Sequence, residues 1–197
     1  STVTNSTTLN GGAIALTITG NSSIGGAISN VTIFSVSGTT SLGADVTTSG
    51  TQTYSGAVTV NGAARTLTTT GDNVTFSSTV NSDSGGARNL TIATGTAATV
   101  QFNGTVGNTY ALGAIAITGT SAALDLNAAI TSATSLSVSG PSDLGANVTT
   151  SGTQTYTGAV TVTGSGTRTL TGSTVTNSTT LNGGAIALTI TGNSSIG

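Results

Sequence analysis

Five aspartates are the residues in this chain best suited to acid–base chemistry, because the sequence contains no glutamate and no histidine. Catalysis by carboxylates needs at least two of them held at one substrate bond. The five are spread along the chain as Asp45, Asp72, Asp83, Asp125 and Asp143. The first of them becomes Asn147 in a second copy of its motif. We therefore expect solvated turn carboxylates and no catalytic residue, so that the chain is not an enzyme; cleavage of a polysaccharide is the alternative.

Metal ligands are equally sparse. Zinc and copper sites depend on His and Cys, and the chain has neither. Secreted β-rolls that bind calcium carry the pattern GGxGxD, whereas the nearest segment here is Gly85-Gly86-Ala87 close to Asp83. We therefore predict no metal ligand, no cofactor-binding residue and no cofactor.

Two tyrosines and two arginines recur in matching contexts. Tyr54 and Tyr156 both stand in the motif TQTY[ST]GAVTV, and Arg65 and Arg168 both precede TLT. Side chains alternate along a strand, so Tyr54 is expected to share the inward face with its motif's valines. An outward tyrosine stacking on a glycan is the alternative. For the arginines we expect pairing with a nearby aspartate or solvation at a corner.

The composition indicates an all-β chain with few charges. Only 4% of the residues are charged, the formal net charge is −2, and Ser and Thr make up more than a third of the chain. Disordered chains of such polarity normally carry a high net charge, whereas the Thr, Val and Ile found here favour strands. There is no basic patch for a nucleic acid and no apolar run of about 18 residues to span a membrane.

The sequence is repetitive at two scales. Residues 173–197 repeat residues 1–25 letter for letter, a displacement of 172 residues. We therefore predict one full repeat unit at 1–172 and the start of an identical unit at 173–197, in one continuous array without separate domains. Within the unit, LGADVTTSGTQTYSGAVTV (42–60) returns with two substitutions at 144–162.

Short alternating segments separated by glycine and Asn-Gly turns predict a parallel β-helix. Segments such as LTITG, FSVSG and IAITG recur mostly 18 to 24 residues apart, which corresponds to about 7–8 coils per unit and roughly 34 to 38 Å of axial length. The two identical segments are expected to adopt one coil shape, displaced along the axis. The residues predicted to point inward in stacked ladders are Ile14, Leu16, Ile18, Val74, Phe76, Ile115 and Ile117.

The strand segments NVTFSSTV, NLTIATG and TVQFNGTV, with the motif LGA[DN]VTTSGTQTY[ST]GAVTV, resemble the giant β-strand-repeat surface proteins of bacteria. These are similar to filamentous-haemagglutinin-like adhesins and autotransporter passengers. The resemblance covers the whole chain and implies a right-handed parallel β-helix, export to the cell surface, and a role in adhesion, biofilm or sheath formation. It places no functional residue on a position of this sequence.

These features predict a structural segment of a long extracellular filament or stalk, located at the bacterial cell surface. Neither end carries a cap, since Ser1 and Gly197 both lie within the pattern. The expected partners are therefore adjacent repeats or identical subunits stacked end to end, with surface or matrix polysaccharide as a further partner. Binding of ice or another ordered surface by Thr-rich strands is the alternative function.

Overall fold

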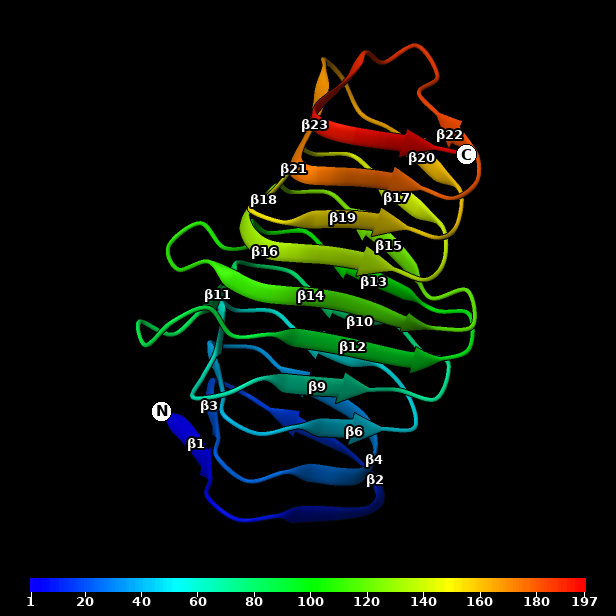
Figure 1. Cartoon of the computed structure of the whole chain (residues 1–197). Coiled ribbons are helices and arrows are strands. Elements are labelled where there is room, and N and C mark those ends of the chain that lie inside the picture. Colours follow the sequence, from blue (N-terminus) through cyan, green and yellow to red (C-terminus); the bar gives the residue numbers. More distant parts are fainter.

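The chain winds into a right-handed parallel β-helix of about ten coils, as the repeat pattern predicts (Figure 1). The computed structural model describes all residues 1–197. In Figure 1 the front strands run from left to right while the chain climbs, which is the right-handed sense. Every strand pairing is parallel, and no helix is present, so none is long and apolar enough to cross a membrane.

Each coil has three sides, which we call face 1, face 2 and face 3 in chain order. Face 1 contains β1 (Thr2–Asn5), β3 (Asn21–Ile24), β5 (Thr40–Leu42), β8 (Val58–Val60), β11 (Val80–Ser82) and β18 (Val148–Thr150). Face 2 contains β6 (Val46–Thr48), β9 (Arg65–Thr68), β12 (Leu90–Gly95), β14 (Leu112–Gly119) and β19 (Thr153–Tyr156). Face 3 contains β7 (Gln52–Tyr54), β10 (Val74–Phe76), β13 (Thr99–Phe102), β15 (Ala123–Leu126), β17 (Ser142–Leu144), β20 (Val160–Val162) and β22 (Leu181–Asn182).

The longer strands bend around a corner and contribute to two faces. Those that link faces 2 and 3 are β2 (Leu9–Ile18) and β4 (Ile28–Val36). Those that link faces 1 and 2 are β16 (Ile130–Val138), β21 (Arg168–Asn177) and β23 (Leu188–Ile196). The three faces therefore enclose a single bore.

One residue from each coil forms a continuous ladder on every face. On face 1 the ladder has ten members, 18 to 26 residues apart: Val3, Ser22, Thr40, Val58, Val80, Val106, Ile130, Val148, Leu170 and Ile190. On face 2 it runs through Leu9, Ile28, Val46, Leu67, Ile92, Ile117, Val138, Tyr156, Asn177 and Ile196. The extra residues of the longer coils therefore lie at the corners and not in the bore.

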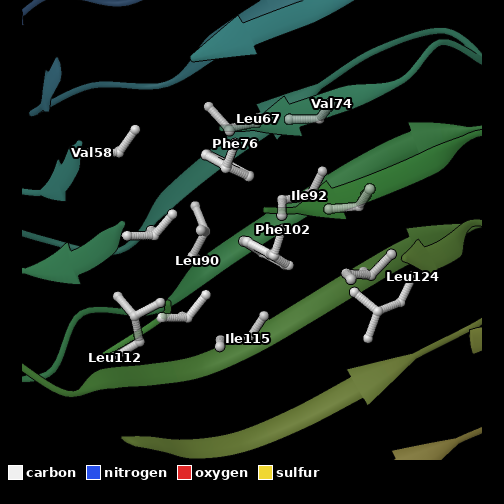
Figure 2. Packing of buried hydrophobic residues seen from close by; sticks show 14 of the residues in the cluster. Val58, Leu67, Val74, Phe76, Leu90, Ile92, Phe102, Leu112, Ile115 and Leu124 are labelled. Carbon is white, nitrogen blue, oxygen red and sulfur yellow. The ribbon is translucent and has the colours of Figure 1, made fainter. Parts of the chain in front are cut away.

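The bore is filled mainly by apolar side chains along the axis. A single cluster of 36 buried apolar residues extends from Ile18 to Val175, so the coils share one core. Phe76 stacks on Tyr54 in the coil before it and on Phe102 in the coil after it, with ring centroids 5.2 and 5.0 Å apart and near-parallel planes. Figure 2 shows Phe76 and Phe102 on neighbouring coils. Because successive coils stack in register, like side chains meet face to face.

The inward positions predicted from alternation are confirmed at six of seven residues, since Leu16 also packs against the core. Ile18, Val74, Phe76, Ile115 and Ile117 are buried. Leu16 is only half-buried, and the prediction for Ile14 is wrong because this side chain is 65% exposed. Two consecutive residues with positive φ, Gly12 and Ala13, interrupt the strand just before Ile14. The first coil also has a neighbour on one side only, so nothing covers this corner.

The two identical segments lie on different faces, so the expectation of a simple axial displacement is wrong. Val3 is in face 1 of the first coil, whereas its counterpart Val175 is in face 2 of the ninth. The 172-residue unit therefore spans eight and one third coils, slightly more than the seven to eight expected. At about 4.8 Å per coil it advances roughly 40 Å.

The stacked rings provide a test of the core. Phe76→Ala would remove the middle ring of the stack and leave a cavity that neighbouring coils cannot fill, so we expect about 3–5 kcal/mol lower stability in denaturant unfolding. Thr75→Ala, on the outward side of the same strand, is the matched control and is expected to change stability by less than about 0.5 kcal/mol. Equal losses in the two variants would contradict the ladder packing.

Candidate functional site

Only two of the five aspartates come together. Asp125 and Asp143 are direct neighbours on face 3, pointing outward from adjacent coils. Asp125 accepts a hydrogen bond from Gln101 Nε2 at 2.7 Å, and Asp143 accepts one from the Thr163 hydroxyl. The pair borders an open hollow of about 370 Å³ that also includes Pro141. A glycosidase needs one carboxyl shielded from solvent as the general acid, whereas Asp143 is exposed and Asp125 is only half-buried.

The other three aspartates make hydrogen bonds at the corners, and those of Asp45 and Asp83 reach an adjacent coil. Asp45 Oδ1 accepts a hydrogen bond from the Thr66 amide at 2.9 Å, and Asp72 pairs through its backbone with Thr69 Oγ1. Asp83 has the richest set of partners. The five carboxylates therefore do not converge on one groove.

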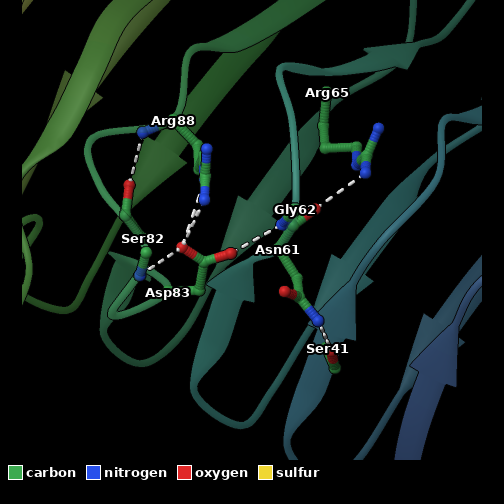
Figure 3. Close-up of polar contacts among 8 residues, drawn as sticks. Ser41, Asn61, Gly62, Arg65, Ser82, Asp83 and Arg88 are labelled. Atoms are coloured by element: carbon green, nitrogen blue, oxygen red, sulfur yellow. Dashed lines mark hydrogen bonds and ion pairs between the residues drawn. The ribbon is translucent and has the colours of Figure 1, made fainter.

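Asp83 organises the loop between β11 and β12 (Figure 3). Its Oδ2 accepts a hydrogen bond from the Gly62 amide at 2.6 Å, and its Oδ1 accepts one from the Gly85 amide at 2.9 Å. Arg88 forms an ion pair with the same carboxylate at 3.1 Å. The Gly62 amide, followed by Arg88 and Gly85, holds the pKa of Asp83 below its usual value against the opposing effect of desolvation.

Arg65 and Arg168 hold the corner turns that precede their strands. Arg65 donates to the carbonyls of Asn61 (2.7 Å) and Ala64 (3.1 Å), and Arg168 donates to that of Ser165 (2.8 Å). Neither forms an ion pair with an aspartate. The expected corner location is therefore confirmed, and the expected pairing with aspartate is wrong.

The repeated motif places a polar network inside the bore. Gln52 Nε2 donates to the carbonyls of Val46 (3.1 Å) and Thr68 (2.9 Å), and Gln52 Oε1 accepts the Tyr54 hydroxyl at 3.0 Å. All polar atoms of the Gln52 side chain are thus satisfied, as burial requires. The second copy repeats the network with Gln154, Val148, Thr171 and Tyr156. The inward prediction for the tyrosines is confirmed, and the alternative of outward stacking on a glycan is wrong for both.

One exposed aromatic residue escaped the sequence reasoning. Tyr110 is 47% exposed and borders a second hollow, of about 330 Å³, on face 1. It lies outside both repeated motifs, in the part of the chain where the coils are longest. Departure from the repeat was therefore the signal that could have identified it.

The three-sided solenoid has the shape of a prism, and its rows of outward-pointing side chains contain different residue types. On face 3 the row runs through Ser35, Thr53, Thr75, Gln101, Asp125, Asp143, Thr161 and Asn182. Binding to ice would require an uninterrupted row of one residue type, and two aspartates and a glutamine interrupt this row. Nothing in this row favours binding to ice.

The buried tyrosines predict a loss of stability in alkali. Burial raises the pKa of both Tyr54 and Tyr156, so the unfolded chain loses these protons first and stability falls above about pH 10, by up to about 1.4 kcal/mol per pH unit for each residue. The chain has no Lys or Cys to titrate in this range. Denaturant unfolding followed from pH 8 upward should show this slope in the wild type. The double variant Tyr54→Phe/Tyr156→Phe should be less stable at neutral pH but nearly flat; an unchanged slope would contradict the assignment.

Comparison of the chain with protein-family models, with curated proteins and with solved structures returned no match. The functional proposal therefore rests on the repeat, the three-sided bore and the chemistry of its surface.

Proposed function

We propose that this chain is a non-catalytic structural segment of a long extracellular filament or stalk on the surface of a bacterial cell. The main support for the proposal is a comparison of matching positions in the two identical segments, which are exposed at an end of the prism and buried inside it. Val3, in the first coil, is 48% exposed, whereas its counterpart Val175 has coils on both sides and is 1% exposed. At the other end Ile196 is 46% exposed and its counterpart Ile24 is 1% exposed. Each end therefore presents a surface that another coil of the same kind would bury.

The backbone at each end supports the same conclusion. Strand β1 pairs only with β3, and β23 pairs only with β21. The outer edges of these strands carry free amide and carbonyl groups, and such edges pair readily with a further strand. Charged residues that would oppose this pairing are rare, since the chain has no lysine and a net charge of −2. The partner is therefore the next repeat of the same array or a second copy of this chain.

The fold also accepts the same motif on more than one face. The Gln52–Tyr54 network faces the bore from face 3, and the Gln154–Tyr156 network faces it from face 2. Units can therefore follow one another although each is turned by one face relative to the last. Three units would complete 25 coils and bring every residue back to its starting face after roughly 120 Å.

Placement at the cell surface is supported by the composition and by the family resemblance. The chain lacks cysteine, and its charge is low. Its repeats resemble those of giant bacterial surface proteins, and in this proposal it supports adhesion, biofilm or sheath formation as a spacer. No specific observation favours ice binding or polysaccharide cleavage over this role.

End-to-end association tests the proposal. Val3→Lys would place a charge where the next coil must pack, so we expect at least about tenfold weaker association, equivalent to about 1.4 kcal/mol. Sedimentation velocity and negative-stain electron microscopy would measure the length distribution of assemblies of the 197-residue chain.

Ile33→Lys is the matched control, because Ile33 is 44% exposed on the side of the prism and not at its end. This variant should assemble like the wild type. A wild-type chain that remains monomeric at high concentration, or equal inhibition by both variants, would contradict end-to-end stacking.

A further inference from the structure

The two longest loops between strands lie at the same corner of the prism. They are residues 83–89, between β11 and β12, and residues 103–111, between β13 and β14. Face 1 ladder members Val80, Val106 and Ile130 are 26 and 24 residues apart, against 18 in the shortest coils. In Figure 1 the two loops project beside β11. Insertions that gather on one side of a solenoid commonly form its binding surface.

Hydrogen bonds hold both loops in fixed positions. The Asp83 carboxylate joins the first loop to Gly62 in the previous coil and to Arg88 (Figure 3). The second loop is attached to β11, since Asn81 Oδ1 accepts the Thr109 amide at 2.9 Å and the Ser82 amide donates to the Tyr110 carbonyl at 3.2 Å. The hollow between them is therefore preorganised.

An exposed aromatic ring and unused polar groups surround this hollow. Of the six aromatic side chains only Tyr110 is exposed; the buried ones are Phe34, Tyr54, Phe76, Phe102 and Tyr156. The lining residues are Thr59, Asn81, Ser82, Asp83, Ser84, Thr109 and Tyr110. The hydroxyls of Thr59, Ser84 and Thr109 and the Asn81 amide nitrogen make no hydrogen bond within the chain. They are free to bind a ligand.

These groups suit a neutral sugar better than other ligand classes. An exposed tyrosine ring offers a flat apolar surface with a polar tip, on which the C–H face of a pyranose can stack. The free hydroxyls and the amide match the sugar's own hydroxyl groups. An anionic ligand would need an unpaired cation, but Arg88 is neutralised by Asp83. An apolar ligand would need a mainly apolar lining, as in most ligand pockets, whereas Tyr110 is the one hydrophobic residue here.

We propose that the hollow bordered by Tyr110, Asn81 and Thr109 binds one sugar residue of a neutral polysaccharide. The site goes beyond the structural role and does not depend on it. The sequence of residues 81–111 does not recur in the chain, so the one complete 172-residue unit carries the site once. If units follow in tandem, the one-face rotation presents successive sites on successive sides of the filament.

The test uses the 197-residue chain and four neutral probes: cellohexaose, laminarihexaose, chitohexaose and mannohexaose. Saturation-transfer NMR and isothermal calorimetry should detect at least one probe with a Kd in the millimolar range or below. Tyr110→Ala should weaken binding at least about tenfold, as truncation of an aromatic anchor does. Tyr110→Phe keeps the ring and should bind within about threefold of the wild type, a difference well under 1 kcal/mol.

Thr161→Ala, in the hollow beside Asp143, is the matched control and should leave the affinity unchanged. Circular dichroism checks that the variants keep the fold. No binding of any probe at about 10 mM, or equal affinity in wild type and Tyr110→Ala, would overturn the site. A loss in Tyr110→Phe as large as that in Tyr110→Ala would overturn stacking on the ring. Filament formation, measured on the same samples, reports separately on the structural role.

Discussion

The parallel hydrogen-bond ladder between one coil and the next is the interaction on which the rest of this structure depends. Each strand has only two to ten residues, so it gains its order from the coils on either side. The ladder also dictates what can lie in the bore. Every inward side chain must pack against the residue one coil before and one coil after it, which is why Phe76 meets Tyr54 and Phe102. The fold thus tolerates few side-chain sizes inside and many loop lengths at the corners.

The largest polar side chains in the bore, Gln52 and Gln154, belong to the repeated motif, and smaller ones such as Ser22 and Thr40 bond to each other across adjacent coils. Gln52 donates to the carbonyl of Val46 within its own motif and to that of Thr68 in the next coil, and its Oε1 accepts the Tyr54 hydroxyl. The second copy forms the same bonds on a different face, because the following coil again supplies a strand carbonyl, that of Thr171, to Gln154. Because the partner outside the motif is only a backbone carbonyl, the motif fits a repeat unit with a fractional number of coils.

The corners of the coils can vary in length and sequence, whereas the bore cannot. Chain can be added there without disturbing the ladder, and the structure places its only ion pair and its only exposed aromatic ring at one such corner. A stalk and a recognition site are therefore compatible in one short segment. The first depends on inward side chains that repeat, and the second depends on outward side chains that do not.

Alternation and repetition in the sequence were sufficient to predict the all-β class, the parallel coils and the inward Phe76, Ile117 and Tyr54, because these depend on local periodicity. The adjacency of Asp125 and Asp143, the exposed Tyr110 and the one-face rotation of the unit depend on which residues of different coils pair. That register is the sum of all the intervening corner lengths. Ile14 has the right parity but lies exposed, because two positive-φ residues and a missing neighbour coil decide its position. Only the tertiary structure could determine these features, since contacts between coils are set by loop geometry that local patterns do not encode.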